Sequence, residues 1–140
     1  MVGIETRYKK VYASGKRKAA VARAIIQTGK GKVTFNGRDY STLQLFDRLK
    51  LEEPLRIAEA VLGKSEFDCV LTVQGGGSQG QIDAARLAMA KGLVEFTGSQ
   101  ELKDAFLTYD RNLLVADSRR KETRKPGDSR ARAMRQTSYR

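Results

Sequence analysis

The chain has 140 residues, a formal net charge of +11, one cysteine and no histidine. This length fits one ordinary domain. The inventory excludes imidazole acid/base chemistry, Ser-His-Asp triads, Cys/His zinc sites and a disulfide within the chain.

Seven basic side chains and no acid lie within residues 7–23. They are Arg7, Lys9, Lys10, Lys16, Arg17, Lys18 and Arg23. Small apolar residues alternate with polar ones before Ser14-Gly15, and again from Ala19 to Gln27, which predicts a β-hairpin. A solvated turn would also explain residues 16–18, but the absence of acids around them favours RNA contact.

The next segment predicts one strand and two helices. Val33–Phe35 is strand-like, and Asn36-Gly37 has the chemistry of a two-residue turn with positive φ. Ser41 and Gln44 have capping-box spacing, which predicts a short helix carrying Leu43, Phe46 and Leu49. A second helix is expected from about Glu52, with Pro54 in its first turn and Gly63 as its stop.

The second half of the body predicts a central strand and two more helices. Residues 67–74 are rich in strand formers on both faces, as expected for a central strand covered by helices, and Cys69 is expected to be buried there. A long helix should bury Ile82, Ala85, Met89, Leu93 and Phe96, with Ser78 and Gln81 as a capping box and a ridge of Ala84, Ala88 and Gly92 for close packing. A last helix beginning at Ser99 should bury Leu102, Ala105, Phe106 and Tyr109.

The pattern predicts an α+β fold in two layers, a mixed sheet of about four strands with helices packed on it. We expect a globular RNA-binding body over residues 1–116 and an extended basic tail over 117–140. The tail has nine basic residues against three acids, a net charge of +6, and too few apolar side chains to fold alone. A polyanion is its natural partner, because contacted phosphates release condensed counterions. The basic tail residues are Arg119, Arg120, Lys121, Arg124, Lys125, Arg130, Arg132, Arg135 and Arg140.

A glycine-rich loop follows the predicted central strand. Gly75, Gly77 and Gly80 match G-x-G-x-x-G, so one alternative is a small dinucleotide-binding domain that uses Gly75–Gly80. The acid at the required spacing, Glu101, falls in a predicted helix, which weakens that alternative. Two further interpretations of the loop are a purely structural turn and contact with an RNA backbone, and we favour contact with RNA. The residues that contact RNA would be Gly75, Gly76, Gly77, Gln79 and Gln81.

No constellation of residues looks catalytic, so we expect no enzyme, no cofactor, no metal and no small-molecule substrate. The acid pairs Glu52-Glu53 and Asp110/Asp117 lack the apolar pocket that a general acid needs. No apolar run is long enough to span a bilayer, and the expected location is cytoplasmic, away from membranes. A basic DNA-compacting protein remains a third interpretation, although it leaves the glycine loop unexplained.

Four segments together resemble the family of the universal small-subunit ribosomal protein number nine, in its archaeal or eukaryotic type. They are GKRKAAVARA (15–24), VQGGGSQGQIDAARLAMAKGL (73–93), YDRNLLVADSRRKE (109–122) and RKPGDSRARAMRQTSYR (124–140). The resemblance implies a left-handed β-α-β crossover and a role as a structural ribosomal protein in translation.

The resemblance also implies partners. The body and tail would bind ribosomal RNA of the small-subunit head beside neighbouring head proteins. The tail tip would contact peptidyl-site transfer RNA through Arg140, with Arg135 and Tyr139 as neighbours. The other basic residues named above and the loop residues would contact ribosomal RNA.

Overall fold

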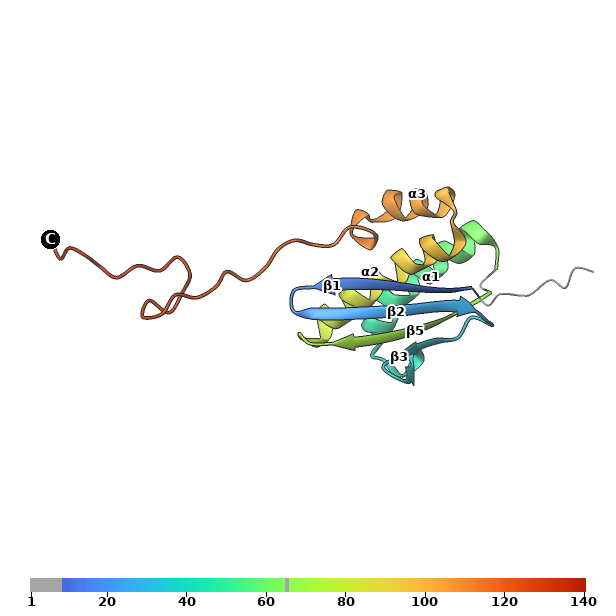
Figure 1. Cartoon of the computed structure of the whole chain (residues 1–140), viewed down its shortest axis with the longest axis horizontal. Helices are drawn as coiled ribbons and strands as arrows, with labels where there is room; N and C mark the ends of the chain where they lie inside the picture. The colour runs from blue at the N-terminus through green and yellow to red at the C-terminus, as the bar shows by residue number, and fades with distance from the viewer. Residues whose placement is uncertain (1–8, 65) are drawn as a thin grey trace, which may run out of the picture.

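A five-stranded sheet forms the centre of the protein in a computed structural model that describes residues 9–64 and 66–140 (Figure 1). The strand order is β1-β2-β5-β3-β4. β1, β2 and β5 are antiparallel neighbours, whereas β3 runs parallel to β5 and antiparallel to β4. The strands are β1 (Lys10–Arg17), β2 (Ala20–Thr28), β3 (Val33–Phe35), β4 (Arg38–Asp39) and β5 (Phe67–Gln74). The α+β prediction is confirmed, and the strand beyond the expected four is the two-residue β4.

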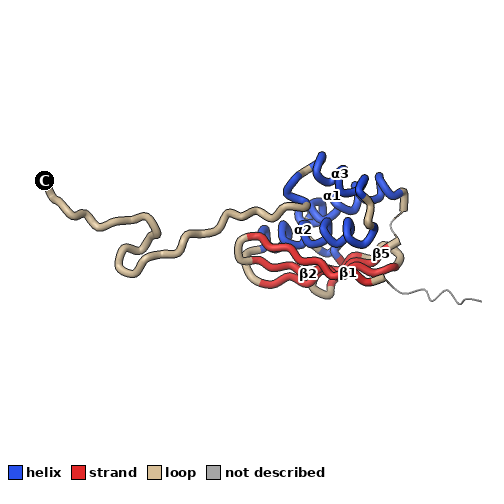
Figure 2. The backbone as a smooth tube through the Cα atoms, turned by 45° about the horizontal axis from the view of Figure 1, so that its top comes forward, coloured by secondary structure: helices blue, strands red, loops and turns tan. Residues whose placement is uncertain are grey.

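Three helices cover one face of this sheet, and the other face is open (Figure 2). They are α1 (Leu45–Leu62), α2 (Ser78–Thr97) and α3 (Gln100–Tyr109). α1 lies between the parallel strands β3 and β5 in the chain, as a β-α-β unit requires. No helix within the described residues is long and apolar enough to cross a membrane.

The hairpin of β1 and β2 is confirmed, but its turn consists only of Lys18-Ala19. Ser14-Gly15 lies inside β1. A Cβ at Gly15 would be 2.4 Å from the carbonyl oxygen of Ala84 and 2.7 Å from the amide nitrogen of Ala88, both on α2. Gly15 is therefore required for the close approach of β1 to α2, and this glycine does not mark a turn.

The central strand β5 has the predicted bounds and is covered by helices as expected. Its odd-numbered residues are buried under the helices, whereas Val70 on the opposite face is 37% exposed. The helices α1, α2 and α3 all lie on the same side of the sheet. Cys69 is fully buried as expected, and desolvation raises the pKa of its thiol to about 12.

The two helices expected between residues 41 and 63 are a single helix, α1. Pro54 lies in its interior, where proline removes one backbone hydrogen bond at a cost of about 3 kcal/mol. Leu51, Pro54 and Ala58 share the buried face, and this burial offsets the cost. Phe46 and Leu49 lie on this helix, but both are exposed, Phe46 to 77%.

Neither predicted capping box forms. The Asp39 carboxylate caps a single 3-10 turn, Tyr40–Thr42, and Gln44 precedes α1 without a side-chain cap. Gly77 is the N-cap of α2, and Ser78 is its first helical residue. Gly63 ends α1 with φ 76°, as predicted, and the Asn36-Gly37 turn has the expected positive φ angles.

The packing predictions for α2 and α3 are largely confirmed. Ala84, Ala88 and Gly92 form a buried ridge against β1 and β2. The Ser99 side chain accepts a hydrogen bond from the Leu102 amide, and α3 buries Leu102 and Phe106. Tyr109 was expected to be buried but is 57% exposed.

Candidate nucleic-acid interface

The turn of the β1–β2 hairpin and the first residues of the tail meet at one end of the sheet. They form a hollow lined by Ala19 and five cationic side chains, and none of its described lining residues is acidic. The cations are Arg17, Lys18, Arg119, Arg120 and Lys121. The cations of the hairpin turn and those of the tail both attract an anion that lies between them, so the hollow suits a phosphate group.

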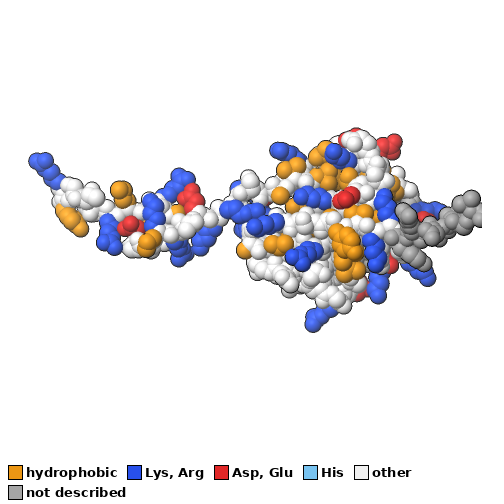
Figure 3. Space-filling view, in the orientation of Figure 1, with side chains coloured by type: hydrophobic (Ala, Val, Ile, Leu, Met, Phe, Trp, Pro, Cys, Tyr) orange, Lys and Arg blue, Asp and Glu red, His pale blue; other side chains and the backbone are white. Residues whose placement is uncertain are grey.

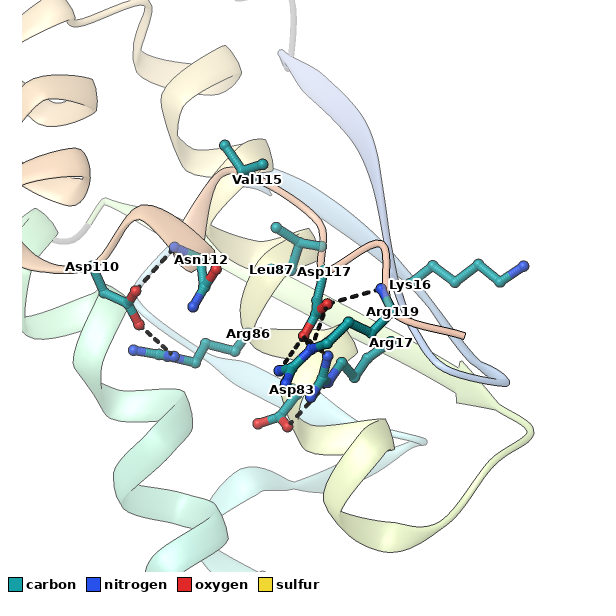
Figure 4. A pocket seen from close by; sticks show the side chains of 10 residues that line it. All are labelled: Lys16, Arg17, Asp83, Arg86, Leu87, Asp110, Asn112, Val115, Asp117 and Arg119. Atoms are coloured by element: carbon teal, nitrogen blue, oxygen red, sulfur yellow. Dashed lines mark hydrogen bonds and ion pairs between the residues drawn. The ribbon is translucent and has the colours of Figure 1, made fainter. Parts of the chain in front are cut away.

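An ion pair between Arg17 on β1 and Asp117 at the start of the tail holds the two segments together (Figure 4). The same carboxylate accepts hydrogen bonds from the Arg119 amide at 2.9 Å and from the Arg119 guanidinium at 2.7 Å. Asp83 on α2 approaches the Arg17 Nε to 3.9 Å. The tail therefore leaves the body from a fixed position, and we call these contacts of Asp117 with Arg17 and Arg119 the joint.

The charge state of this joint is stable around neutral pH. Hydrogen bonds from the Arg119 side chain, followed by its backbone amide, hold the pKa of Asp117 well below the ordinary value, and the Arg17 side chain adds to the effect. The same partnership raises the pKa of Arg119. Both groups remain charged across the physiological range.

A second ion-pair cluster fixes the helices behind the joint. Arg86 on α2 pairs with Glu53 on α1 and, at 3.2 Å, with Asp110 after α3. The Asp110 carboxylate also accepts a hydrogen bond from the Asn112 amide at 2.9 Å. These acids, which were considered as catalytic pairs, instead serve as partners of structural cations.

The glycine loop packs against the hairpin turn. Gly75 and Gly76 have φ angles of 76° and 64°, and a Cβ on either would lie within 3 Å of the backbone of Ala19 or Ala20. These two glycines therefore have a structural role. A Cβ on Gly77 would meet nothing within 4 Å, so this residue alone of the three faces open space at the start of α2.

The glutamines of the loop also have contacts within the protein. The Gln81 side chain donates to the Gly75 carbonyl at 3.0 Å, and the Gln79 side chain accepts from Lys50 at 3.2 Å. α2 and α3 follow the loop, with no further strand in the described part of the chain, and Glu101 lies in the first turn of α3. The loop therefore lacks the second strand and acid of a dinucleotide-binding fingerprint.

Comparison with known families decides between the remaining interpretations. A family model described as ribosomal protein S9/S16 matches residues 15–140. The chain belongs to the ribosomal protein S9/S16 family. The resemblance in the four segments is confirmed, and the membership identifies a ribosomal protein and not an enzyme.

Relatives of this S9/S16 chain match it over almost its whole length. The small ribosomal subunit protein uS9 of Methanococcus vannielii is 45% identical over 135 residues, covering 94% of this chain and 99% of the relative. The protein of the same name from Methanothrix thermoacetophila is 44% identical over 133 residues, with the same shares covered. These relatives are archaeal, in agreement with the type expected from the terminal residues.

The remaining predicted site residues of the body are spread over the sheet. Lys16 is exposed near the hairpin turn, and Arg23 lies in the middle of the open face. Lys9 and Lys10 are at the far end of β1, where the Lys9 ammonium donates to the Phe96 carbonyl and lies 5.4 Å from the centre of its ring. Arg7 lies outside the described residues.

The tail runs outward from the body without a helix or strand (Figures 1 and 3). Arg132 pairs with Glu122 at 2.6 Å, and Arg135 pairs with Asp128 at 3.2 Å. The other cations beyond the joint, Lys121, Arg124, Lys125, Arg130 and Arg140, are exposed. Tyr139, beside the last residue, is 87% exposed.

Sequence reasoning missed Asp117 and Asp83, which position Arg17. It counted Asp117 as a charge that lowers the tail's net value and as one member of an acid pair with Asp110, and it assigned no partner to Asp83. The available signal was the location of Asp117, at the border of the body and immediately before Arg119 and Arg120. The pairing of Asp117 with Arg17 joins residues 100 positions apart, so no pattern within either segment of the sequence indicates it.

Proposed function

We propose that this S9/S16 family protein is a structural constituent of the small ribosomal subunit and binds ribosomal RNA of the subunit head. Its RNA-binding surface comprises the hairpin turn, the open end of the glycine loop and the basic tail. The observation that carries the proposal is the hollow between Lys18 and Lys121, where five cations from distant segments converge without a lining acid.

The mechanism is neutralisation of phosphates by Lys and Arg with release of condensed counterions. An arginine can contact two phosphate oxygens at once, which also fixes the orientation of the backbone. Gly77 and the first turn of α2 add backbone N–H groups, the donors by which helix N-termini bind phosphates. The protein thereby holds RNA in place and catalyses no reaction.

Salt dependence of RNA binding tests the role of the tail. In one variant six exposed tail cations become glutamine: Arg120, Lys121, Arg124, Lys125, Arg130 and Arg140. If each meets a phosphate, the slope of log K against log salt for ribosomal RNA should become less steep by about 4 to 5, from roughly 0.7 to 0.9 per contact. Equal slopes for the variant and the unaltered chain would refute the tail's role.

A matched pair of variants separates location from charge. Replacing Arg120 and Lys121 with glutamine should weaken binding, whereas replacing Lys64 and Lys103, exposed cations of the helical side, should not. Sedimentation of the unaltered chain with small subunits from a cell lysate tests the assignment as a whole, and its absence there would overturn the proposal.

We further propose that the tail delivers its tip to peptidyl-site transfer RNA. Its 24 residues span at most about 80 Å when fully extended, at roughly 3.3 to 3.6 Å each. Arg140, with Arg135 and Tyr139 beside it, is the contact residue. The fixed joint at Asp117 supports this proposal, because a tether with a defined origin samples fewer positions than a free chain.

A further inference from the structure

The open face of the sheet carries an ordered pattern of side chains that the tail and hairpin turn do not explain. Strand register places these side chains in rows across β1, β2 and β5. One row is apolar and consists of Tyr12, Ile25 and Val70. The next row is polar and consists of Ser14, Arg23 and Thr72.

The centre of this face is accessible and hollowed. The Tyr12 ring is 69% exposed although it lies in the middle of a strand. Two shallow hollows flank the polar row, and both are lined by Arg23 and Thr72. One of them is also lined by Tyr12 and Ile25. An aromatic ring, a guanidinium and the hydroxyls of Ser14 and Thr72 therefore line this one hollow.

The charge of this face favours a polyanion over a protein surface of mixed charge. Lys10, Lys16 and Arg23 project from it, and Figure 3 views this side of the molecule. Among the described residues of β1, β2 and β5, Asp68 is the one acid on this face. Its carboxylate accepts hydrogen bonds from the backbone amides of Lys30 and Lys32, each at 2.9 Å. That acid lies at the end of the face beyond the apolar row.

Tyr12 and Arg23 also have the spacing that a nucleotide requires. Adjacent residues on one face of a strand are about 7 Å apart, so the tyrosine and arginine rows are separated by a distance that one nucleotide spans. Unpaired bases stack on exposed aromatic rings, and sheets present such rings in known RNA-binding modules. Duplex RNA buries its base faces and cannot stack in this way.

We propose that the open sheet face binds an unpaired nucleotide of RNA, with its base stacked on Tyr12 and its phosphate held by Arg23 and Thr72. This proposal deepens the proposed function, on which it rests, by assigning single-stranded RNA to a surface separate from the hairpin turn and tail. Tyr12 is the stacking residue, and Arg23 is the phosphate-binding residue.

The test compares two labelled strands of about twelve nucleotides, oligo(A) and an abasic strand with the same backbone. Binding is measured on the full-length variant with six neutralised tail cations, so that the tail does not mask the sheet. The chain with Tyr12 intact should prefer oligo(A) by about 5- to 150-fold, the effect of one base–aromatic stack. Tyr12→Ala should abolish this preference without changing the salt slope, and Tyr12→Phe should keep it.

Arg23→Gln should weaken binding of both strands and make the salt slope less steep by about 0.7, the value for one contact with a single strand. Tyr109→Ala is the matched control, since Tyr109 is similarly exposed but lies on α3. The Tyr109→Ala chain should prefer oligo(A) as strongly as the chain in which Tyr12 and Tyr109 are both intact.

Equal binding of oligo(A) and the abasic strand by the chain with Tyr12 intact would overturn the proposal. So would a Tyr12→Ala chain that retains its oligo(A) preference but no longer sediments with small subunits, because the face would then dock a protein. Failure of the proposed function would appear separately, as absence of the unaltered chain from small subunits.

Discussion

Arg17 and Asp117 form an ion pair across 100 positions of the chain, and this contact joins the basic tail to the hairpin. Without it, the tail would leave the body after Leu114 and Val115, the last residues before Asp117 with packing or hydrogen-bond contacts to the body. With it, the first tail cations lie beside Lys18 and complete the acid-free hollow. The joint therefore brings the cations of the hollow together and sets the direction of the tail.

Asp117→Ala should free the tail root. Arg17 and Arg119 lose the carboxylate that accepts their hydrogen bonds, so the backbone amides of residues 118–121 should show lower heteronuclear NOE values in NMR relaxation measurements. The melting temperature of the body should stay unchanged, because the ion pair lies at the surface. Asp128→Ala is the matched control, since it removes the same charge from the tail but leaves the joint intact. Equal NOE values in both variants would contradict the role of Asp117.

Gly15→Ala should destabilise the fold although it adds only one methyl group. The new Cβ would clash with backbone atoms of Ala84 and Ala88 that a helix cannot move, and overpacking of this kind costs about 1–3 kcal/mol or more. Chemical denaturation measures the loss. Gly77→Ala places the same methyl group in open space without positive φ, so its cost should stay below about 1 kcal/mol, that of alanine at an N-cap. Similar stabilities of the two variants would contradict the close approach of β1 to α2.

Sequence patterns predicted the elements whose signal is local and failed where distant contacts decide. The alternation in β2 and the periodicity of α2 were sufficient to place both. Gly15 was misinterpreted because a glycine allows a turn and a close approach equally, and only the position of α2 distinguishes them. Pro54 suggested a helix start, but burial with Leu51 and Ala58 carries the helix through it.

The candidate interface was predicted only in part, for the same reason. Local charge identified the hairpin turn and the tail as basic, yet nothing in either segment indicates that they share one hollow. The residues of β5 indicated a strand covered by helices, but they did not indicate what its other face would do. Val70 continues the open row that begins at Tyr12, a relationship that depends on strand register.

Asp68 should make the stability of the sheet edge depend on pH. Hydrogen bonds, above all from the Lys32 amide, lower the pKa of this carboxyl below its ordinary value of 3.8. The unfolded chain therefore takes up the proton at a higher pH than the folded chain. The stabilisation is fully present above the unfolded value and is lost as the pH falls through the folded one.

Asp68→Asn should consequently lower the free energy of unfolding at pH 7 by up to about 1 kcal/mol, because asparagine keeps the Oδ1 acceptor and loses only a charge that solvent screens. The difference from the unaltered chain should shrink as the pH falls below 3.8, which urea denaturation across a pH series can follow. Glu95→Gln, at an exposed carboxylate on α2, is the control. A stability difference that is independent of pH would contradict the assigned hydrogen bonds.

Arg140→Ala tests the division of labour between body and tail tip. Arg140 is one of nine tail cations, so its loss leaves enough positive charge for the chain to enter small subunits at the normal level. Transfer RNA bound at the peptidyl site of those subunits should lose about tenfold or more in affinity, the size of one charge-assisted hydrogen bond to phosphate. Filter binding with purified subunits measures this affinity.

Arg124→Ala is the matched control, because it removes the same charge from the middle of the tail. This variant should bind transfer RNA normally once it is in the subunit, and it should weaken the binding of free protein to ribosomal RNA. If Arg140→Ala instead impaired assembly and left transfer RNA affinity unchanged, Arg140 would be one more rRNA-binding cation. The fixed joint at Asp117 would then orient a tail that has no target at its end.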